Sequence, residues 1–381
     1  MAAVGIDYTP AYEQGAGIGR YVRELIAALA QVDEHTTYRL FVAGLAGRSG
    51  LPPAPGQNFA WAGTRLTPLW LARLWQRAHS PYPTVNHWLG DLDLYHATDF
   101  VLPPVRAGTR TIVQVHDLSF VLVPEAASPN LKRYLDAVVP RSVRRADHVL
   151  ADSHATKADL ARLYGTPPEK ITVLWGGVAA HFRPVTDPTA QQAVRTKYGL
   201  GDWPFLFTVG TVQPRKNYGR LIEALARLHA DFADLHLVIA GGRGWLEDPI
   251  YATVARLKLD EYVHFIGFAA DEDLPVLYGM AAVVPYLSLY EGFGFPVLEA
   301  MACGAPVVAS QVSSIPEVAG DAAVLVDPLD VTAITDALGS LLASAAERET
   351  LITRGHAQAA QFTWDRSARQ LADVYRRILA Q

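Results

Sequence analysis

The sequence predicts an α/β fold built from two doubly wound domains of similar size, each with a parallel sheet. Short apolar runs alternate with longer segments of helical periodicity along the whole chain, which is the pattern of βαβ units. The chain has 381 residues, too many for one compact core and enough for two. Half of the residues are hydrophobic and 19% are charged, so the chain can bury both cores.

The first half of the chain contains apolar runs of strand length, separated by helical stretches. The expected strands are Ala3–Thr9, Tyr38–Ala43, Leu94–Thr98, Thr111–His116, His148–Asp152 and Ile171–Trp175. The main helices expected between them are Gly19–Gln31, Pro129–Arg145 and His154–Tyr164. Short apolar runs that recur between helical segments indicate a parallel sheet.

The second half restarts the same rhythm. Its expected strands are Phe205–Val209, Leu235–Ala240, Val263–Gly267, Ala282–Tyr286, Pro306–Ser310 and Ala322–Val326. Its expected helices are Tyr218–Phe232, Pro249–Leu257, Glu272–Gly279, Pro296–Ala302 and Asp330–Ala343. The repetition predicts a second sheet of the same kind.

The join between the two domains is expected in the segment Phe182–Trp203. Three prolines, Pro184, Pro188 and Pro204, lie in or beside this polar stretch. The predicted first domain is therefore residues 1–184 and the second is residues 201–363. In two such domains a ligand should bind in the cleft at the carboxyl ends of both sheets.

The composition excludes several classes of protein. Thirty-three Lys and Arg against 38 Asp and Glu give a formal charge of −5, which argues against a nucleic-acid binder. One cysteine, Cys303, excludes an internal disulfide and a cysteine-built zinc site. The first residues lack the basic start and apolar run of a signal peptide, and no stretch reaches the ~18 apolar residues of a membrane span. We expect a cytoplasmic enzyme.

The segment from Glu291 to Pro306 carries the strongest chemical signal. It follows a strand and opens a helix, with Pro296 near the first helical position. Gly292 and Gly294 let the backbone approach a ligand, and a helix start favours phosphate. Glu291 in the loop and Glu299 in the first helical turn should face one pocket and accept hydrogen bonds from sugar or ribose hydroxyls. The alternative is a glycine-rich loop with two solvated acids.

A second segment, Val209 to Asn217, follows the first strand of the second domain. Arg215 and Lys216 stand side by side just before a helix, where they could hold a diphosphate. The alternative is a charged loop in which Asn217 caps the helix.

The first domain opens with a glycine-rich turn that contains Gly15, Gly17 and Gly19. It is not the dinucleotide fingerprint, because Arg20 replaces the third glycine, and it is not a P-loop. The glycines permit close approach to a ligand across the cleft, or they form a plain flexible turn.

His116 and Asp117 end a strand of the first domain and should also face the cleft. A histidine at this place can hydrogen-bond a hydroxyl or a phosphate, and Asp117 could fix its ring or cap the next element. The alternative is a structural strand-end histidine.

Two Asp-x-Asp triplets could in principle hold a divalent metal near a diphosphate. Asp91-Leu-Asp93 precedes a strand, and Asp271-Glu-Asp273 is interpreted as a helix N-cap. Neither lies where the cleft is expected, so no metal is predicted.

Together these residues resemble the retaining GT-B glycosyltransferases of the large family called glycosyl transferases group 1, or family 4. The most specific element is the signature Glu-Gly-Phe-Gly-x-Pro-x-x-Glu-Ala-Met-Ala-x-Gly-x-Pro, in which seven residues separate Glu291 from Glu299. Further segments follow in the expected order along nearly the whole chain: 210–217, 240–242, 263–268, 315–318 and 362–364. The resemblance implies two Rossmann-like domains that face each other across a cleft, with the last helix, residues 364–381, completing the first domain.

The resemblance also implies roles for individual residues. Four are assigned to catalysis: Arg215 and Lys216 on the donor's diphosphate, Glu291 on the sugar hydroxyls, and His116 on the sugar from the other domain. The assigned donor-binding residues are Gly17, Gly19, Thr211, Gly241, Gly267, Phe268, Gly292, Phe293, Gly294, Phe295 and Glu299. Among these, Glu299 takes the ribose hydroxyls, the base lies near Gly267 and Phe268, and Gly17 and Gly19 line the phosphate side of the acceptor cleft. Many members carry arginine where this chain has Thr211, so here the charge must come from Arg215 and Lys216.

The activity implied is transfer of a hexose from a nucleotide-diphosphate sugar to a glycan or lipid-linked sugar acceptor, with retention and without a metal or other cofactor. The variant Gly-Thr-x-x-Pro-Arg-Lys-Asn resembles the branch rich in mannosyltransferases of surface-polysaccharide assembly, which favours GDP-mannose as the donor. Two alternatives stay open: a GT-B-like nucleotide-sugar epimerase, and a non-catalytic nucleotide-sugar-binding protein.

The stretch of residues 61–90 suggests a place where the acceptor is met. It contains four tryptophans, three arginines (Arg65, Arg73 and Arg77) and no acid. Leu66, Leu69, Trp70 and Leu74 share one helical face, while Arg73 and Arg77 lie on another. Such a helix can lie in a membrane surface, which would bring the enzyme to a lipid-linked acceptor at the inner membrane. The alternative is an ordinary helix packed on the first domain.

Overall fold

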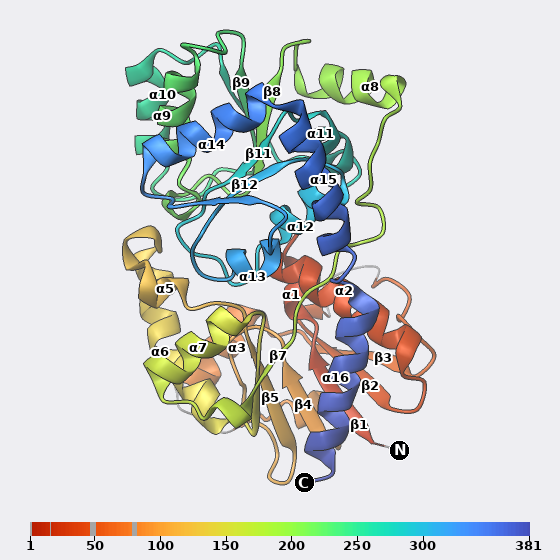
Figure 1. Cartoon of the computed structure of the whole chain (residues 1–381). Coiled ribbons are helices and arrows are strands. Elements are labelled where there is room, and N and C mark those ends of the chain that lie inside the picture. The colour runs from red at the N-terminus through yellow and green to blue at the C-terminus, as the bar shows by residue number, and fades with distance from the viewer. Residues whose placement is uncertain (1, 16, 46–50, 78–81) are drawn as a thin grey trace. The chain divides into compact units, whose positions relative to one another are not determined.

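A computed structural model describes residues 2–15, 17–45, 51–77 and 82–381 (Figure 1). Its contacts divide the chain into two compact units. Unit 1 comprises Met1–Leu118, Pro129–Gly177 and Thr363–Gln381, and unit 2 comprises Ser119–Ser128 and Val178–Phe362. The fold is α/β in both units, as the alternation of apolar runs and helical segments predicts.

Unit 1 is built on one parallel sheet in the order β3-β2-β1-β4-β5-β6-β7. The strands are β1 Ala3–Asp7, β2 Thr37–Ala43, β3 Phe59–Thr64, β4 Leu94–Ala97, β5 Arg110–Val115, β6 His148–Ala151 and β7 Ile171–Val173. The sequence does not predict β3, because this strand lacks a continuous apolar run and lies at the edge of the sheet, partly exposed. The strand order reverses between β1 and β4, whose carboxyl ends therefore form the switch point of this sheet.

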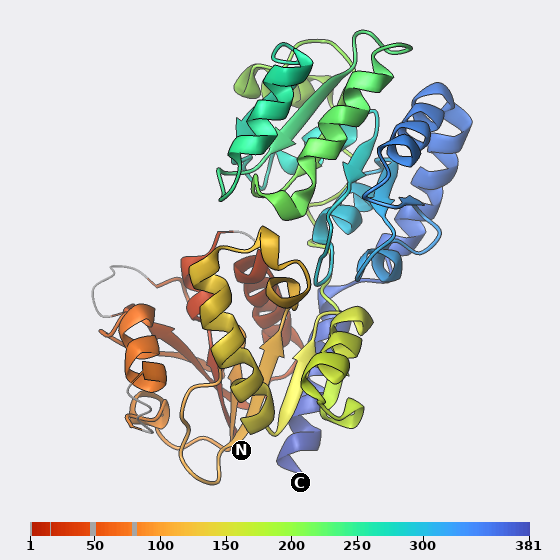
Figure 2. The ribbon, with the colours of Figure 1, turned by 90° about the vertical axis from the view of Figure 1, so that its left-hand side faces the viewer.

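The helices of unit 1 include its C-terminal helix. They are α1 Thr9–Glu13, α2 Gly17–Val32, α3 Pro68–Ala72, the π-helical turn Arg73–Arg77, α4 Asn86–Leu89, α6 Pro129–Arg145, α7 His154–Tyr164, the 3-10 turn Pro168–Lys170 and α16 Trp364–Leu379. Helix α16, violet in both views, packs along α2 (Figure 1, Figure 2). Tyr375 fixes it to the sheet, because its Oη lies 2.8 Å from Nδ1 of buried His96 in β4.

Unit 2 contains two short parallel sheets with the orders β10-β9-β8 and β11-β12-β13. The strands are β8 Phe205–Val209, β9 His236–Ala240, β10 Val263–Gly267, β11 Val284–Tyr286, β12 Val307–Ser310 and β13 Val324–Val326. A parallel bridge between Leu206 and Val283 connects β8 to the chain that leads into β11. The strand order therefore reverses between β8 and β11, which makes their carboxyl ends the switch point of unit 2.

The helices of unit 2 depart from the prediction in the segment expected to join the domains. They are α5 Ser119–Leu122, the 3-10 turn Pro124–Ala126, α8 Pro188–Tyr198, the 3-10 turn Pro214–Lys216, α9 Tyr218–Leu228, α10 Asp248–Leu257, α11 Leu274–Met280, α12 Phe295–Ala302, α13 Ile315–Ala319, α14 Val331–Ala343 and α15 Ala345–Ala359. Helix α8 occupies half of 182–203 and belongs to unit 2. Its proline is the reason: Pro188 starts the helix after Asp187, whose side chain accepts from Thr189 N, and Gly199 ends it in the left-handed conformation.

The division between the units also differs from the predicted boundaries. Unit 2 begins at Val178 instead of in the segment 182–203, and it includes Ser119–Ser128 from the first half of the chain. Val123 and Ala126 pack with Tyr290 in a small apolar cluster. Trp245 Nε1 donates to Ala126 O at 2.7 Å. These contacts attach the excursion between β5 and α6 to unit 2.

Gly177 is a sensitive point in unit 1, because a Cβ there would lie 2.3 Å from Trp364 N at the start of α16. We expect Gly177→Ala to destabilise the protein by about 1–3 kcal/mol through overpacking. Urea unfolding followed by circular dichroism measures the change. Gly219→Ala is the control: no atom lies within 4 Å of its Cβ position, and alanine in helix α9 should stabilise the fold by up to about 1 kcal/mol. Equal stability of the two variants would contradict this account.

Candidate active site

The candidate site of unit 2 lies at its switch point, where β8 and β11 end side by side. Gly210 follows β8, and its turn packs directly on the turn after β9. A Cβ on Gly241 would lie only 2.0 Å from Gly210 O, so these two turns approach each other backbone to backbone. The glycines of the predicted donor site therefore have a structural use here: they bring the turns after β8 and β9 together.

Arg215 and Lys216 lie in the 3-10 turn that follows β8. Asn217 comes next with a left-handed backbone, φ 59°, and begins α9. The sequence left open that the Asn217 side chain caps α9, but it makes no such hydrogen bond. It donates instead to Leu287 O at 3.1 Å and to Pro328 O at 2.7 Å. Asn217 thus connects the turn after β8 to the segments that follow β11 and β13. These bonds hold in place the turn that carries Arg215 and Lys216.

The two cations share the carboxylate of Glu291. Arg215 Nη1 lies 2.7 Å from Glu291 Oε2, and Lys216 Nζ lies 2.7 Å from Oε1. The three side chains are largely buried, with exposed fractions of 18%, 10% and 10%. Burial raises the pKa of Glu291, but Arg215 and Lys216 together outweigh it and hold that pKa well below its usual range. The cluster carries one net positive charge, which suits an anionic ligand.

The loop that carries Glu291 is fixed by two serines. Ser313 Oγ accepts from Glu291 N at 2.9 Å, and Ser314 Oγ lies 2.9 Å from Glu291 O and 2.7 Å from Phe293 O. Gly294 then starts α12 with φ 115°, and the first backbone N–H groups of α12 follow. Such a helix start is suited to phosphate. Neither serine is predicted from the sequence, because nothing in their spacing distinguishes them from other loop residues.

Glu299 lies one turn later than predicted. It is the fifth residue of α12, in the second turn, and 4% exposed. Its Oε2 accepts from Tyr278 Oη at 3.0 Å. Tyr278 is fully buried in α11 and packs on the ring of Phe207 in β8. The tyrosine therefore sets the direction of this carboxylate.

The other predicted donor-site residues divide into open positions and core positions. Gly267 ends β10 with φ 70° and open space at its Cβ position, and Phe268 beside it is 64% exposed. Thr211 is half-buried after β8, and Gly292 is buried. Phe293 is 4% exposed and packs with Phe295 and Phe362, so its side chain belongs to the core of unit 2.

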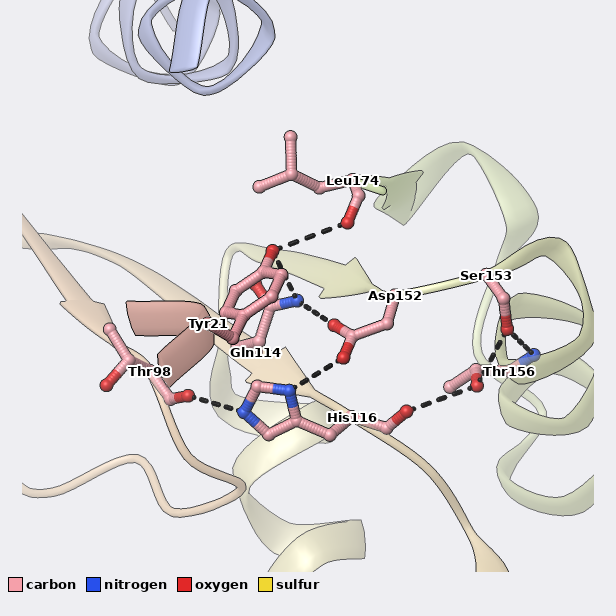
Figure 3. Close-up of polar contacts among 8 residues, drawn as sticks. All are labelled: Tyr21, Thr98, Gln114, His116, Asp152, Ser153, Thr156 and Leu174. Atoms are coloured by element: carbon pink, nitrogen blue, oxygen red, sulfur yellow. Dashed lines mark hydrogen bonds and ion pairs between the residues drawn. The ribbon is translucent and has the colours of Figure 1, made fainter. Parts of the chain in front are cut away.

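In unit 1, His116 lies in a buried polar network at the carboxyl ends of β4, β5, β6 and β7 (Figure 3). Its Nδ1 lies 2.8 Å from Asp152 Oδ2, after β6, and its Nε2 lies 2.9 Å from Thr98 O, after β4. Gln114 Nε2 donates to Asp152 Oδ1 and lies 3.3 Å from Tyr21 Oη. Tyr21 Oη in turn donates to Leu174 O. The ring is therefore held by Asp152, and not by the adjacent Asp117 as the sequence suggested.

The two partners of the His116 ring determine its protonation. A carboxylate and a carbonyl oxygen both accept, so both ring nitrogens carry a proton. Burial lowers the pKa of His116, but the charge and hydrogen bond of Asp152, with the charge of Asp99 and the bond to Thr98, raise it to about 9. His116 is 5% exposed, and both of its ring nitrogens act as hydrogen-bond donors.

The glycine-rich turn of unit 1 serves the packing of α2. A Cβ on Gly19 would lie 2.0 Å from Gln14 O, so glycine is required there by the chain itself. Gly17 begins α2 with φ 42° and has open space at its Cβ position. Of the two predicted phosphate-side glycines, Gly17 is the open one.

The carboxylates of the Asp-x-Asp triplets have protein partners. Asp91 pairs with Arg106, and Asp93 Oδ2 accepts from Ala3 N at 2.8 Å. Asp273 holds the N-cap position of α11, but its side chain makes no cap and pairs with Lys197 at 2.5 Å. Within the described ranges, no group of three His, Cys, Asp or Glu residues is arranged to hold a metal ion.

Comparison with known proteins identifies the family. The model of glycosyl transferases group 1 matches residues 191–358, and that of glycosyltransferase family 4 matches residues 15–182. O-antigen chain mannosyltransferase B of Escherichia coli is 33% identical over 372 residues, which covers 94% of this chain and 96% of that protein. The chain therefore belongs to the group 1 glycosyl transferases and is a glycosyltransferase.

Two further similarities extend the comparison. A GDP-mannose-dependent α-(1-6)-phosphatidylinositol monomannoside mannosyltransferase of Mycolicibacterium smegmatis is 35% identical over 251 residues, 62% of each chain. The solved structure of sucrose-phosphate synthase from Thermosynechococcus elongatus superimposes with a TM-score of 0.77 at 22% identity, with full coverage of both chains. The fold is GT-B, as the sequence predicted.

The His116–Asp152 pair predicts a pH-dependent contribution to stability. The pKa of His116 is raised from 6.5 to about 9, so the contribution is complete below pH 6.5 and is lost as the pH rises through about 9. In Asp152→Asn an amide replaces the charge and the contribution should disappear. Urea unfolding at pH 6 and at pH 10 should show a difference between wild type and variant that shrinks at the higher pH.

A direct measurement accompanies this test. In ¹⁵N-histidine spectra at pH 7.5 the His116 ring should be doubly protonated in wild type and singly protonated in Asp152→Asn, with His116→Gln used to assign the signal. His148, which pairs with Thr172 Oγ1 and no carboxylate, is the internal control. A neutral His116 ring in the wild-type protein would contradict the assignment.

Proposed function

We propose that this glycosyltransferase moves mannose from GDP-mannose to a glycan or lipid-linked sugar acceptor, with retention of configuration and without a metal ion. The observation that carries the proposal is the buried cluster of Arg215, Lys216 and Glu291 at the switch point of unit 2. The names of two relatives, O-antigen chain mannosyltransferase B and a GDP-mannose-dependent mannosyltransferase, support mannose as the sugar and GDP as the nucleotide.

The chemistry follows from charge. A nucleoside diphosphate leaves readily only when its developing negative charge is neutralised by groups already in place. Arg215, Lys216 and the start of α12 supply that charge within one unit. A bound diphosphate competes with Glu291 for both cations. The Glu291 carboxylate has further lone pairs, so it can accept from a sugar hydroxyl while it still holds a cation.

The paired-carboxylate scheme of glycosidases does not suit this site. That scheme needs one carboxyl group with a raised pKa as a general acid. Glu291 has the opposite environment, because two cations hold its pKa well below the usual range. We infer that the departing phosphate oxygen itself takes the proton of the acceptor, which also accounts for retention.

Lys216→Ala tests the diphosphate assignment. We expect a loss of roughly 10²–10³ in kcat, as for removal of one preorganised charge contact. The assay offers purified protein a panel that includes GDP-mannose and UDP-glucose and measures nucleotide release with and without acceptor. Lys197→Ala is the matched control, since Lys197 forms an ion pair with Asp273 elsewhere in unit 2. Wild-type kcat in Lys216→Ala would overturn the assignment.

The same panel distinguishes the alternatives. An epimerase would convert the donor to its epimer without needing an acceptor, and a binding protein would retain the donor without turnover. A glycosyltransferase releases nucleotide faster when the right acceptor is added. Activity that excess EDTA abolishes and Mg²⁺ restores would contradict the metal-independent mechanism.

We also propose that the stretch 61–90 meets a membrane surface. Residues 78–81 of this stretch lie outside the described residues. In the described part of the chain, four of the exposed large hydrophobic residues fall within residues 66–82 of the sequence: Leu66, Leu69, Trp70 and Tyr82, with 38%, 60%, 58% and 72% exposure. Leu71 is the buried anchor of α3. An ordinary packed helix would bury Leu69 and Trp70, so the exposure favours the membrane interpretation.

One detail of this stretch differs from the sequence prediction. Arg73 was expected on another side from Trp70, but its guanidinium lies 5.2 Å from the Trp70 ring centroid. A π-helical turn, Arg73–Arg77, changes the spacing there. A tryptophan with a cation over its ring suits the interface between lipid and water. No helix of the described residues is long and apolar enough to span a bilayer.

Liposome co-sedimentation tests the membrane proposal. Binding should require anionic lipid, fade with salt and fall when the exposed pair is changed to Leu69→Gln/Trp70→Gln. An Arg65/Arg73/Arg77→Ala variant should also bind less, since each arginine contributes about 1 kcal/mol near an anionic surface. Leu131→Gln is the control, an equally simple change at a 46% exposed leucine on α6. Equal sedimentation of all variants would favour a soluble acceptor.

A further inference from the structure

Tyr286 is a buried tyrosine that touches the proposed diphosphate site and that no motif marks. It is the last residue of β11 and only 3% exposed. Its Oη accepts from Lys216 Nζ at 2.9 Å, and the same Nζ lies 4.9 Å from the centroid of its ring. The tyrosine therefore contacts Lys216 in two ways, through the hydroxyl oxygen and through the ring.

The hydroxyl of Tyr286 also reaches Glu291. Burial is the largest cause that raises the pKa of Tyr286, and the charge of Glu291 and a hydrogen bond with it add to the effect. Tyr286 is therefore a neutral phenol at physiological pH. One oxygen accepts from the ammonium group and donates to the carboxylate, so Tyr286 connects the ion pair of Lys216 and Glu291.

Tyr286 and Glu291 hold the ammonium group of Lys216 in different ways. Glu291 holds Lys216 by neutralising part of its charge, whereas Tyr286 orients the ammonium group and leaves the charge intact. When a diphosphate competes with Glu291 for the cations, Lys216 keeps its hydrogen bond to Tyr286, because the acceptor there is a neutral oxygen. It also places the ammonium group at the carboxyl end of β11, where the switch point of unit 2 lies.

We propose that Tyr286 is a positioning residue that holds Lys216 in place for the leaving diphosphate. The inference rests on the proposed function, because it gives Lys216 its role there. Tyr286 acts only through Lys216, and its hydroxyl matters separately from its ring. The ring fills space in the core of unit 2, so a change that removes the whole side chain would confuse the two effects.

The test is a double-mutant cycle with Tyr286→Phe, Lys216→Ala and the combined variant. Phenylalanine keeps the ring and its contact with Lys216 and removes only the hydroxyl. We expect Tyr286→Phe to lower kcat and the affinity for the nucleoside diphosphate by about tenfold, because Lys216 loses one charge-assisted hydrogen bond while Glu291 still holds it. In the Lys216→Ala background, Tyr286→Phe should cause no further loss.

The affinities are measured by calorimetry with GDP and UDP, and kcat by nucleotide release. Tyr38→Phe is the matched control: Tyr38 is fully buried in unit 1 and its Oη donates to a carboxylate, Asp33, at 2.8 Å. It should lower stability without changing nucleotide affinity. In the double-mutant cycle, the absence of a further loss from Tyr286→Phe in the Lys216→Ala background is a readout that a purely structural role of the Tyr286 hydroxyl would not produce.

The outcomes separate the two proposals. If Lys216→Ala weakens nucleotide binding but Tyr286→Phe matches wild type, or if the two losses add in the combined variant, the positioning role is wrong and the proposed function stands. If the wild-type protein binds neither GDP nor UDP, the diphosphate site is wrong and the role of Tyr286 is wrong with it.

Discussion

The arrangement of unit 2 depends on one buried carboxylate that is shared by two cations. Removing Arg215, Lys216 and Glu291 from water costs free energy that can exceed the gain from their mutual attraction, so such a cluster is weak evidence for stability. Its net positive charge suits an anionic ligand. In the function that we propose, a diphosphate competes with Glu291 for both cations. Neighbouring residues hold this cluster in place. Asn217 fixes the turn that carries Arg215 and Lys216. Ser313 and Ser314 fix the loop that carries Glu291, and Tyr286 connects the turn to the loop.

The sheet explains why these residues meet. In a parallel sheet the carboxyl ends of all strands lie at one edge. Where the strand order reverses, two neighbouring strands end side by side and the loops that follow them lead in opposite directions. Lys216 and Glu291 are 75 residues apart in the chain, yet β8 and β11 bring them together. The close approach of Gly210 and Gly241 adds the turn after β9 to the same edge. The position of the site is thus fixed by topology, and the residues at the strand ends decide its chemistry.

The sequence predicted the parts of this site that carry local signals. Arg215, Lys216 and Glu291 stand in glycine- and proline-rich segments at the ends of apolar runs, and these runs are strands in the structure. Residues that act through distant partners carried no such signal. Asp152 lies 36 positions after His116 in the sequence, and Tyr286 stands at the end of an apolar run, where no motif marks its contact with Lys216. The prolines near 184–188 were misinterpreted as a linker because proline begins helices as readily as it interrupts them, and Asp187 with Gly199 supplies both caps of α8.

The protonation states of the candidate groups restrict the mechanism further. A general base must be able to accept a proton near neutral pH. His116 cannot, because Asp152 and Thr98 occupy its ring nitrogens as acceptors. Glu291 is a poor base, because two cations stabilise its charge, and Arg215 and Lys216 only donate. His116 in unit 1, and Arg215 and Lys216 in unit 2, therefore act as hydrogen-bond donors and cannot deprotonate an acceptor. In the reaction that we propose, the oxygen of the departing phosphate acts as the base, and proton transfer on that side of the sugar would retain the configuration.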